Sequence, residues 1–206
     1  NRTHPTLVRN LTGVTDIEAG ARHTCAIYGT GSVSCWGQGT SGQIGDGSTA
    51  NRPVPTAVFG VSDASQLATG SAHNCVLRTN GRVACWGFNN AGQLGDNMTA
   101  TRTVPTDVAG LTSIVQVVAG YQHSCALRSN GRVACWGLNS NGQLGDNTTT
   151  NRLTPVDVLG LTDAVQIAAG YSHTCALRAN GTVQCWGYNG YGGIGDGTTA
   201  QRNAPV

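Results

Sequence analysis

Short apolar runs of five or six residues alternate along this chain with polar segments rich in Gly, Asn, Asp and Thr. An apolar period of 3.6 residues is not sustained over ten residues anywhere, so the pattern predicts almost no helix. The runs instead carry β-branched and aromatic residues and end at turn-forming residues, which is typical of strands. The pattern of apolar and polar positions therefore predicts an all-β protein.

The third copy of this pattern indicates which strands one unit contributes. Residues 115–119 are mostly β-branched and predict a buried strand. Residues 123–128 and 132–137 predict a strand pair, because the Asn-Gly dipeptide between them is a hairpin signal. Residues 139–152 are rich in turn-forming residues and predict a long loop. Residues 154–158 predict a last strand, which its proline confines to a sheet edge or a strand start.

The pattern recurs four times at a spacing of fifty residues, without an insertion or a deletion. A fixed period in this range is the signature of stacked supersecondary units, as in solenoids and propellers. With 206 residues and 39% hydrophobic content, the chain can bury one sizeable core. We therefore expect a single array over residues 1–206, with repeats at about 1–50, 51–100, 101–150 and 151–200, and with residues 201–206 starting the next phase.

The cysteine pair of each copy fixes the hairpin register. With a two-residue Asn-Gly loop, Cys125 would face Trp136, and the two sulfurs would lie on opposite sides of the sheet. A three-residue loop, with Gly131 in the left-handed conformation, makes Cys125 and Cys135 direct neighbours. Directly opposed residues have Cα atoms about 4.5 to 5.5 Å apart, which a disulfide can bridge. The sequence thus predicts four hairpin disulfides, Cys25–Cys35, Cys75–Cys85, Cys125–Cys135 and Cys175–Cys185.

In this register both faces of each hairpin are apolar. In the third copy one face carries His123, Cys125, Leu127, Val133 and Cys135, and the other carries Ala126, Ala134 and Trp136. A sheet that is apolar on both sides must be covered on both sides, and in a repeat protein the neighbouring repeats cover it. A stack of small antiparallel sheets packed face to face is a β-propeller or a close relative.

Charge and cysteine content limit the compartment and the partners. Charged residues make up 11% of the chain, Lys is absent, and the net charge of +2 is too small and too evenly spread for nucleic acid or an anionic membrane surface. No apolar run approaches the roughly 18 residues that span a bilayer, so we expect no membrane insertion. Eight paired cysteines indicate an oxidising, extracellular setting. We expect any export signal to have been removed or to lie outside this sequence.

The repeat resembles that of the regulator of chromosome condensation family, through the pattern Ala-Gly-x-x-His-Ser/Thr-x-Ala-Leu-x-x-x-Gly-x-Val-x-x-Trp-Gly-x-Asn-x-x-Gly-Gln-Leu-Gly-Asp followed by Arg-x-x-Pro. The resemblance covers essentially the whole chain. It implies a β-propeller of four-stranded blades, usually seven to a ring. It implies little about function, because the family includes a nuclear exchange factor for a small GTPase, a plant ultraviolet receptor, parts of ubiquitin ligases and a secreted inhibitor of β-lactamase.

The chain departs from this family in three respects. Its cysteine pairs replace apolar residues of the cytosolic and nuclear members, which argues against the GTPase and ubiquitin roles. It has no blade insertion of the kind used to open a GTPase. It also has four repeats rather than seven, which leaves three alternatives: it is part of a longer array, two chains combine, or four blades close by themselves.

Two columns of residues invite a metal interpretation. Four histidines near a ring axis could ligate zinc or copper, but the family repeat carries this histidine without a metal, so we expect a structural role. Each aspartate loop offers one carboxylate, which is too few for calcium; we expect ion pairs or hydrogen bonds within the loop. We therefore predict no metal site at His23, His73, His123 and His173, or at Asp46, Asp96, Asp146 and Asp196 with Arg52, Arg102, Arg152 and Arg202.

A further group of arginines flanks the hairpin turns. We expect these side chains to form a solvated edge rather than a phosphate site. They are Arg78, Arg82, Arg128, Arg132 and Arg178.

The aromatic residues other than Trp differ between the repeats. Tyr28 and Phe59 are among them. Variation on a repeated scaffold is where binding specificity usually lies. We therefore predict partner-binding residues among Phe88, Tyr121, Tyr171, Tyr188 and Tyr191.

Five Asn-x-Ser/Thr triplets would accept N-glycans if the source makes them, although a Thr- and Asn-rich loop also produces such triplets by chance. They begin at Asn1, Asn10, Asn97, Asn147 and Asn180.

Catalytic motifs are missing from the sequence: it contains no Gly-x-Ser-x-Gly, no His-Glu-x-x-His and no phosphate-binding Gly-rich loop with Lys. We therefore predict no enzyme activity and no cofactor. The function that the sequence favours is that of an extracellular structural or interaction protein, a scaffold for surface adhesion or self-assembly. The alternative is a secreted binding module that captures or inhibits one specific protein.

Overall fold

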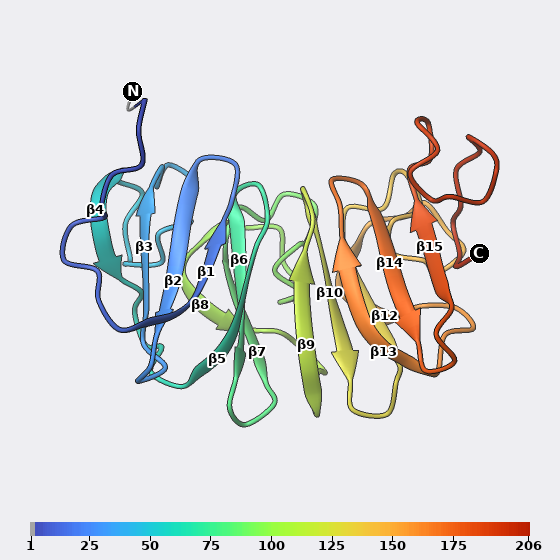
Figure 1. Ribbon diagram of the computed structural model, residues 1–206, viewed down its shortest axis with the longest axis horizontal. Coiled ribbons are helices and arrows are strands. Elements are labelled where there is room, and N and C mark those ends of the chain that lie inside the picture. Colours follow the sequence, from blue (N-terminus) through green and yellow to red (C-terminus); the bar gives the residue numbers. More distant parts are fainter. Residues whose placement is uncertain (1–2) are drawn as a thin grey trace.

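The computed structural model describes residues 3–206, which form four antiparallel sheets arranged side by side like the blades of a fan (Figure 1). We call each sheet a blade. Blade 1 contains β1 (Val14–Ala19), β2 (His23–Tyr28), β3 (Val33–Gly37) and β4 (Arg52–Ala57), and blade 2 contains β5 (Ala64–Thr69), β6 (His73–Arg78), β7 (Val83–Gly87) and β8 (Arg102–Asp107). Blade 3 contains β9 (Ile114–Ala119), β10 (His123–Arg128), β11 (Val133–Gly137) and β12 (Arg152–Asp157), and blade 4 contains β13 (Ala164–Ala169), β14 (His173–Arg178) and β15 (Val183–Gly187).

Blade 4 has three named strands, and the last residues of the chain take the place of a fourth. Gly187 forms an isolated antiparallel bridge with Arg202. Further along, Cys185 and Val206 exchange two backbone hydrogen bonds of 3.2 Å. Residues 202–206 therefore occupy the position that β12 occupies in blade 3.

The predicted all-β propeller architecture is confirmed, with every element of residues 3–206 a strand. The boundaries in blade 3 shift slightly. β12 starts two residues earlier than predicted, because Gly137 pairs with Arg152 across a register shift in the ladder. Pro155 lies on this strand, and β12 is at the edge of its sheet, where a missing N–H is tolerated.

The hairpin register follows the bulged turn. Cys125 lies directly opposite Cys135, and Gly131 adopts a φ of 79°, as a left-handed bulge residue requires. The two Cα atoms are 4.1 Å apart and the sulfurs are bonded. The same geometry recurs in the other blades, so the structure contains the disulfides Cys25–Cys35, Cys75–Cys85, Cys125–Cys135 and Cys175–Cys185.

The core lies between blades rather than within one sheet. Three apolar clusters fill the three spaces between successive blades, and we call these spaces seams. Each seam combines the disulfide face of one blade with the tryptophan face of the next. In the first seam, the Cys25–Cys35 bridge and Val33 belong to the same cluster as Trp86 of blade 2. Each blade therefore depends on its neighbour to cover its apolar surface.

The four blades form an open arc. Blade 1 and blade 4 lie at opposite ends of the fan (Figure 1). Val183 on the outer face of blade 4 is 60% exposed, whereas its equivalent Val133 is 0% exposed. On the outer face of blade 1, Ile17 is 56% exposed and its equivalent Leu67 is 2% exposed. Closure of four blades by themselves, one of the three expected arrangements, is therefore not adopted.

The exposure of the disulfides predicts the order of their reduction. Cys175 is half-buried because no blade covers it, whereas the cysteines of blades 1 to 3 are 0% exposed. Under limited reduction and alkylation of the native protein, mass spectrometry should find Cys175 and Cys185 labelled first. Equal labelling of all four pairs would contradict the burial of the three seams.

Removing a buried disulfide should destabilise the fold, because the unfolded chain gains conformational entropy. Cys125→Ala with Cys135→Ala opens a loop whose ends are 10 residues apart. The chain-entropy model gives a loss of about 3 kcal/mol in the free energy of unfolding for a loop of this size. Denaturant titration of the double variant against the parent protein measures this loss, and an unchanged midpoint would contradict it.

Candidate functional site

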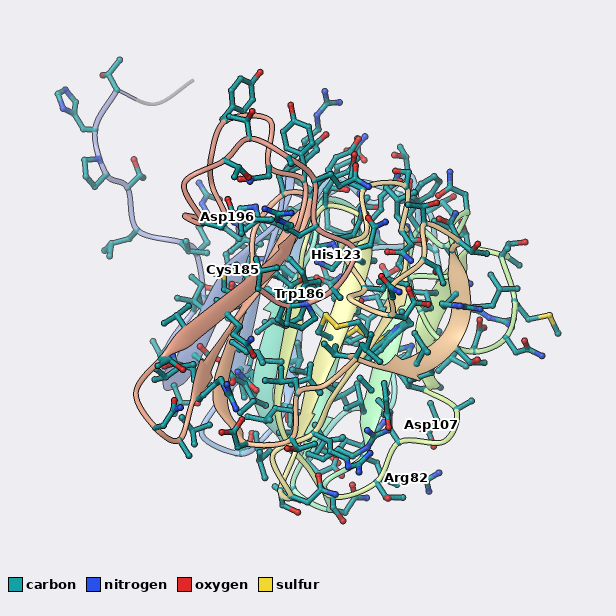
Figure 2. The ribbon with its side chains drawn as sticks, turned by 90° about the vertical axis from the view of Figure 1, so that its right-hand side faces the viewer. Arg82, Asp107, His123, Cys185, Trp186 and Asp196 are labelled. Carbon is teal, nitrogen blue, oxygen red and sulfur yellow. A yellow bond between two sulfur atoms is a disulfide. The ribbon has the colours of Figure 1, made fainter. Side chains whose placement is uncertain are left out.

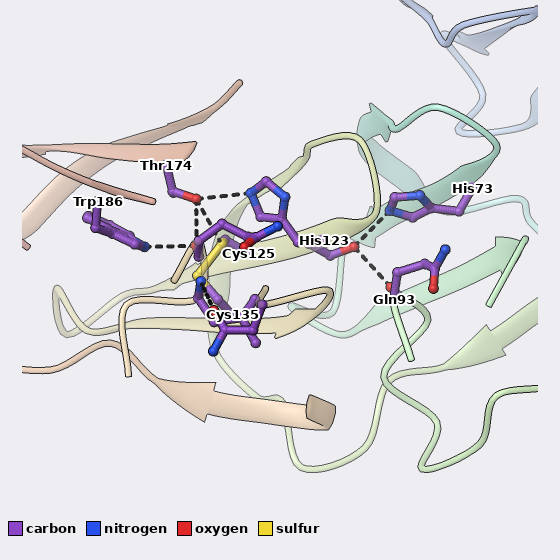
Figure 3. Close-up of a disulfide and its surroundings, with 11 residues drawn as sticks. His73, Gln93, His123, Cys125, Cys135, Thr174 and Trp186 are labelled. Carbon is purple, nitrogen blue, oxygen red and sulfur yellow. Dashed lines mark hydrogen bonds between the residues drawn. A yellow bond between two sulfur atoms is a disulfide. The ribbon is translucent and has the colours of Figure 1, made fainter. Parts of the chain in front are cut away.

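The histidines of the repeats join neighbouring blades. Nε2 of His73 lies 3.0 Å from Ser124 Oγ of the next blade, and Nε2 of His123 lies 3.0 Å from Thr174 Oγ1 (Figure 3). Nε2 of His23 lies 2.7 Å from Asn74 Oδ1 in the same way. Each contact joins residues 51 positions apart, so one repeat always reaches the next.

A backbone carbonyl completes this arrangement in each seam. Ser124 Oγ donates to the carbonyl of Gln93 at 3.0 Å, and Trp136 Nε1 donates to the same oxygen at 2.9 Å. The serine hydroxyl has one proton and donates it to the carbonyl. It must therefore accept the hydrogen bond from His73, which places the histidine proton on Nε2. The Gln143 carbonyl accepts hydrogen bonds from Thr174 Oγ1 and Trp186 Nε1 in the same way.

The seam histidines are neutral. Burial and the neighbouring His123 and His23 lower the pKa of His73 to about 3, and burial with His173 lowers the pKa of His123 to about 4. Nδ1 of both rings is buried and has no partner among the described residues, so a second proton would be an unpaired buried donor. These histidines therefore act as fixed donors between blades.

The histidine column does not converge on one point. Each ring is engaged with a different blade, and residues 3–206 contain no group of three His, Cys, Asp or Glu side chains that could hold a metal ion. The arrangement supports a structural role for His23, His73 and His123. His173 is half-buried, because no following blade covers it.

The aspartate column organises its own loops. Asp146 accepts from the backbone N–H of Thr148 and from Arg152 Nε, at 3.1 and 2.8 Å. Asp196 accepts from Thr198 and Arg202 in the same way. The hydrogen bond from the Thr198 hydroxyl, together with those from the Thr198 backbone N–H and from Arg202, lowers the pKa of Asp196 to about 2. Both structural alternatives for this column, the ion pair and the loop hydrogen bond, therefore occur together.

The hairpin arginines are paired with acidic groups. Arg78 Nη1 lies 2.7 Å from Asp63, and Arg82 Nη2 lies 3.2 Å from Asp107. This second pair is labelled at the lower end of the blades in Figure 2, away from Asp196. The remaining pairs are Arg128 and Arg132 with Asp157, and Arg178 with Asp163. A basic surface for phosphate is therefore not formed by these side chains.

Four of the five predicted partner-binding aromatic residues form one surface. The rings of Tyr121 and Tyr171 are stacked, with centroids 4.1 Å apart and an interplanar angle of 15°. Tyr188 and Tyr191 meet edge to face at 5.9 Å. Tyr171, Tyr188 and Tyr191 together line a hollow of 300 Å³. We call these four tyrosines the aromatic surface.

The aromatic surface is open to solvent at blades 3 and 4. Tyr191 is 93% exposed and Tyr171 is 67% exposed. Phe88 is not part of it. Its side chain is half-buried on blade 2, and its backbone N–H donates to the carbonyl of Ala72. Phe59 is also exposed, but it follows β4 near the hairpin turns, at the other end of the blades from Tyr121.

Comparison with known proteins now identifies the repeat. The family model of the RCC1-like domain matches residues 1–206. The chain belongs to this family. No curated protein sequence matches it. Among the residues that the structure describes, no helix has the length and apolarity of a membrane span.

Solved structures of RCC1-like proteins share the fold. Human WBSCR16 is 26% identical, with a TM-score of 0.86 over 97% of this chain and 54% of that protein. Prp20p of Saccharomyces cerevisiae, described with its binding to Gsp1p and histones, is 22% identical, with a TM-score of 0.85 over 97% and 51%. The chain spans about half the length of both.

A more distant similarity is to the ectodomain of a receptor kinase. The ectodomain of the receptor kinase CR4 from Physcomitrella patens is 23% identical, with a TM-score of 0.57 over 84% of this chain and 39% of that one. At this identity the likeness describes the fold alone.

Sequence reasoning missed the acceptors of the seam. Each of these acceptors is a backbone carbonyl that accepts two hydrogen bonds, and they belong to Gln43, Gln93 and Gln143. A backbone oxygen has no signature in the sequence, because every residue has one. The polar partner of the histidine had a detectable signal, since a small polar residue stands beside the first cysteine of every repeat. These residues are Thr24, Asn74, Ser124 and Thr174.

The neutral seam histidines should make stability depend on pH. An unfolded histidine has a pKa of about 6.5, so below that pH the unfolded chain binds protons that the folded chain excludes. The free energy of unfolding should be fully retained above pH 6.5 and fall as the pH decreases toward 4, by at most about 1.4 kcal/mol per pH unit for each histidine. Urea titrations across this range measure the slope.

The variant His123→Gln isolates one of these groups. Its amide can donate to Thr174 but does not titrate, so it should reduce the slope by the share of one histidine. The matched control is His4→Gln, because His4 is exposed. An unchanged slope in the His123 variant would show that this seam does not exclude protons.

Proposed function

We propose that this chain is a non-catalytic interaction scaffold that acts outside the cytosol and binds a protein partner through the aromatic surface. The observation that carries the proposal is the hollow lined by Tyr171, Tyr188 and Tyr191, with Tyr121 stacked on Tyr171 beside it. Tyrosine offers a large contact area at a small cost in side-chain entropy, and it is enriched where binding energy is concentrated.

The other repeats support a binding role for these tyrosines, because they carry small residues at the equivalent positions. The position of Tyr171 is occupied by Ala21 in blade 1 and Ser71 in blade 2, and that of Tyr191 by Ser41 and Ala91. Packing of the repeat therefore does not require a tyrosine at either place. Exposed aromatic groups that packing does not require indicate a contact surface.

The surroundings of the hollow suggest the chemistry of the partner. The hollow is lined by three tyrosines with Ser172, His173 and Gly193, none of them a carboxylate or an arginine. The acidic and basic groups of the nearby loop, Asp196 and Arg202, are paired with each other. We expect the partner to insert an apolar or aromatic side chain flanked by uncharged hydrogen-bonding groups.

An extracellular location is supported by the disulfides. Four bridges in one chain are typical of oxidising compartments. The receptor-kinase ectodomain among the similar structures is consistent with this location. Surface adhesion and self-assembly are the uses of such a scaffold that the sequence favours.

Glycan attachment is part of the proposed extracellular role. Four of the predicted acceptor asparagines are exposed, and Asn1 lies outside the described residues. Asn97 and Asn147 have φ values of 62° and 61°, at a position where blades 1 and 4 carry Gly. These two asparagines are therefore also explained by backbone conformation, since Asn tolerates positive φ better than most residues.

Binding experiments with matched variants test the aromatic surface. The immobilised chain is exposed to the extracellular proteins of its source, and the captured partner is purified and titrated. Tyr171→Ala and Tyr121→Ala should each weaken binding about thirtyfold, because a central interface tyrosine contributes about 2 kcal/mol.

Phe59→Ala is the control, since it removes an equally exposed aromatic side chain at the other end of the blades. It should leave the affinity unchanged. A partner that binds both tyrosine variants as tightly as the parent chain would overturn the proposal. Thermal unfolding of each variant confirms that the fold is intact.

A further inference from the structure

Equivalent residues in the turn between the first and second strands of each blade form a row across the array. The row consists of Ala21, Ser71, Tyr121 and Tyr171. The backbone N–H of each residue donates to the carbonyl of the next one along, at 3.3, 3.2 and 3.0 Å. The step from one blade to the next is therefore repeated three times with the same backbone contact.

Aromatic rings in this row stack on one another. The rings of Tyr121 and Tyr171 are nearly parallel, with centroids 4.1 Å apart. The step from Ser71 to Tyr121 has the same backbone contact as the step from Tyr121 to Tyr171. A ring over Ser71 would therefore stack on Tyr121 as Tyr121 stacks on Tyr171. Serine has no ring, so the chain leaves this third stacking position to another group.

The third stacking position belongs to a hollow of 360 Å³. The hollow is lined by four equivalent triplets that contain no charged side chain, residues 19–21, 69–71, 119–121 and 169–171. A cavity of about 150 Å³ already holds a benzene ring, so the hollow has room for an aromatic side chain. Blade 2 packs against blade 1 on one side and blade 3 on the other, so the position over Ser71 lies within the array.

The seams prevent the neighbouring backbone of the hollow from carrying side chains. A Cβ at Gly70 would clash with the ring of His73 and with the carbonyl of Gly120. Gly20 and Gly120 are confined by their own histidines and by the next blade in the same way. The contacts that join the blades thus require glycine immediately before these members of the row. The side chain at position 71 therefore decides whether the third stacking position is open.

We propose that the position over Ser71 is an aromatic subsite, which takes an aromatic side chain of the protein partner as the third ring of the stack. One face of this ring lies on Tyr121. The lining favours an uncharged ring, since a charge brought into this hollow would lose water without gaining an ionic partner. Tyr171 lines both this hollow and the hollow of Tyr188 and Tyr191, so the subsite is continuous with the aromatic surface.

The aromatic subsite rests on the proposed function, because it names the group that the partner brings to the aromatic surface. The stacking position itself is a property of this chain, since it follows from the step between blades 2 and 3. Small aromatic probes can therefore test it in the absence of the partner. The subsite and the proposed function can then fail separately.

Uncharged amino-acid amides are suitable probes of the subsite. N-acetyl-tryptophan amide and N-acetyl-tyrosine amide are titrated to millimolar concentrations into the isotope-labelled chain with its disulfides intact. Heteronuclear NMR should show saturable shifts of the backbone amide signals of Ser71 and Tyr121. N-acetyl-leucine amide is the matched probe without a ring. It should bind about two- to tenfold more weakly, because it lacks the stacking contribution.

The variant Ser71→Tyr fills the third position with a ring of the chain itself. It should remove the saturable binding of both aromatic amides, and Tyr121→Ala should remove it because the stacking face is lost. Ser129→Tyr is the matched control, since it adds the same ring at an exposed hairpin turn and should leave the affinity unchanged. Ser71 is half-buried and lies outside the apolar clusters of the seams, so its variant is expected to fold.

Three results would overturn the aromatic subsite. One is the absence of saturable shifts at Ser71 and Tyr121 with either aromatic amide. Another is a leucine amide that binds as tightly as the aromatic amides. The third is amide binding that Ser71→Tyr leaves unchanged. The proposed function is judged by the affinity of the partner for Tyr171→Ala, so each of these results overturns the subsite even if that affinity falls as expected.

Discussion

The hydrogen bond from a buried neutral histidine to the next blade is the constraint on which the rest of this structure depends. It joins residues 51 positions apart in all three seams. The residue that accepts it in turn donates to a backbone carbonyl, which also accepts from the tryptophan of the next blade. Burying these polar groups would be unfavourable if any one of them lacked its partner. The seam therefore fixes the orientation of each blade relative to the last, and the apolar cluster fills the space that this orientation leaves.

Much of the fold follows from the sequence because the informative contacts are local. The strand pair 123–128 and 133–137 is set by a three-residue turn, and the position of Gly131 and the two cysteines permits one register. The seam could not be derived in this way. In the second seam, for example, the acceptor is the backbone carbonyl of Gln93, and any residue at that position would provide one. The contact also joins two different repeats. The early start of β12 at Arg152 also depends on a ladder irregularity that no side chain signals.

The candidate site was partly predictable for a different reason. Departure from the repeat singles out Tyr121, Tyr171, Tyr188 and Tyr191 as residues without a packing role, but it singles out Phe88 equally. Sequence alone does not reveal that the first four meet at adjoining blades, whereas Phe88 lies half-buried on blade 2. Stacking between Tyr121 and Tyr171 arises because equivalent positions of adjacent blades are brought together, which is a property of the array.

The separation of only 10 residues within each disulfide bears on how the protein matures. Eight cysteines can be joined in 105 ways. Because each correct partner lies across a short hairpin, it is the nearest thiol as soon as that hairpin forms, and long-range mispairing has to compete with a much smaller loop. The hairpins can therefore oxidise one at a time, each as it forms, without waiting for the blades to stack.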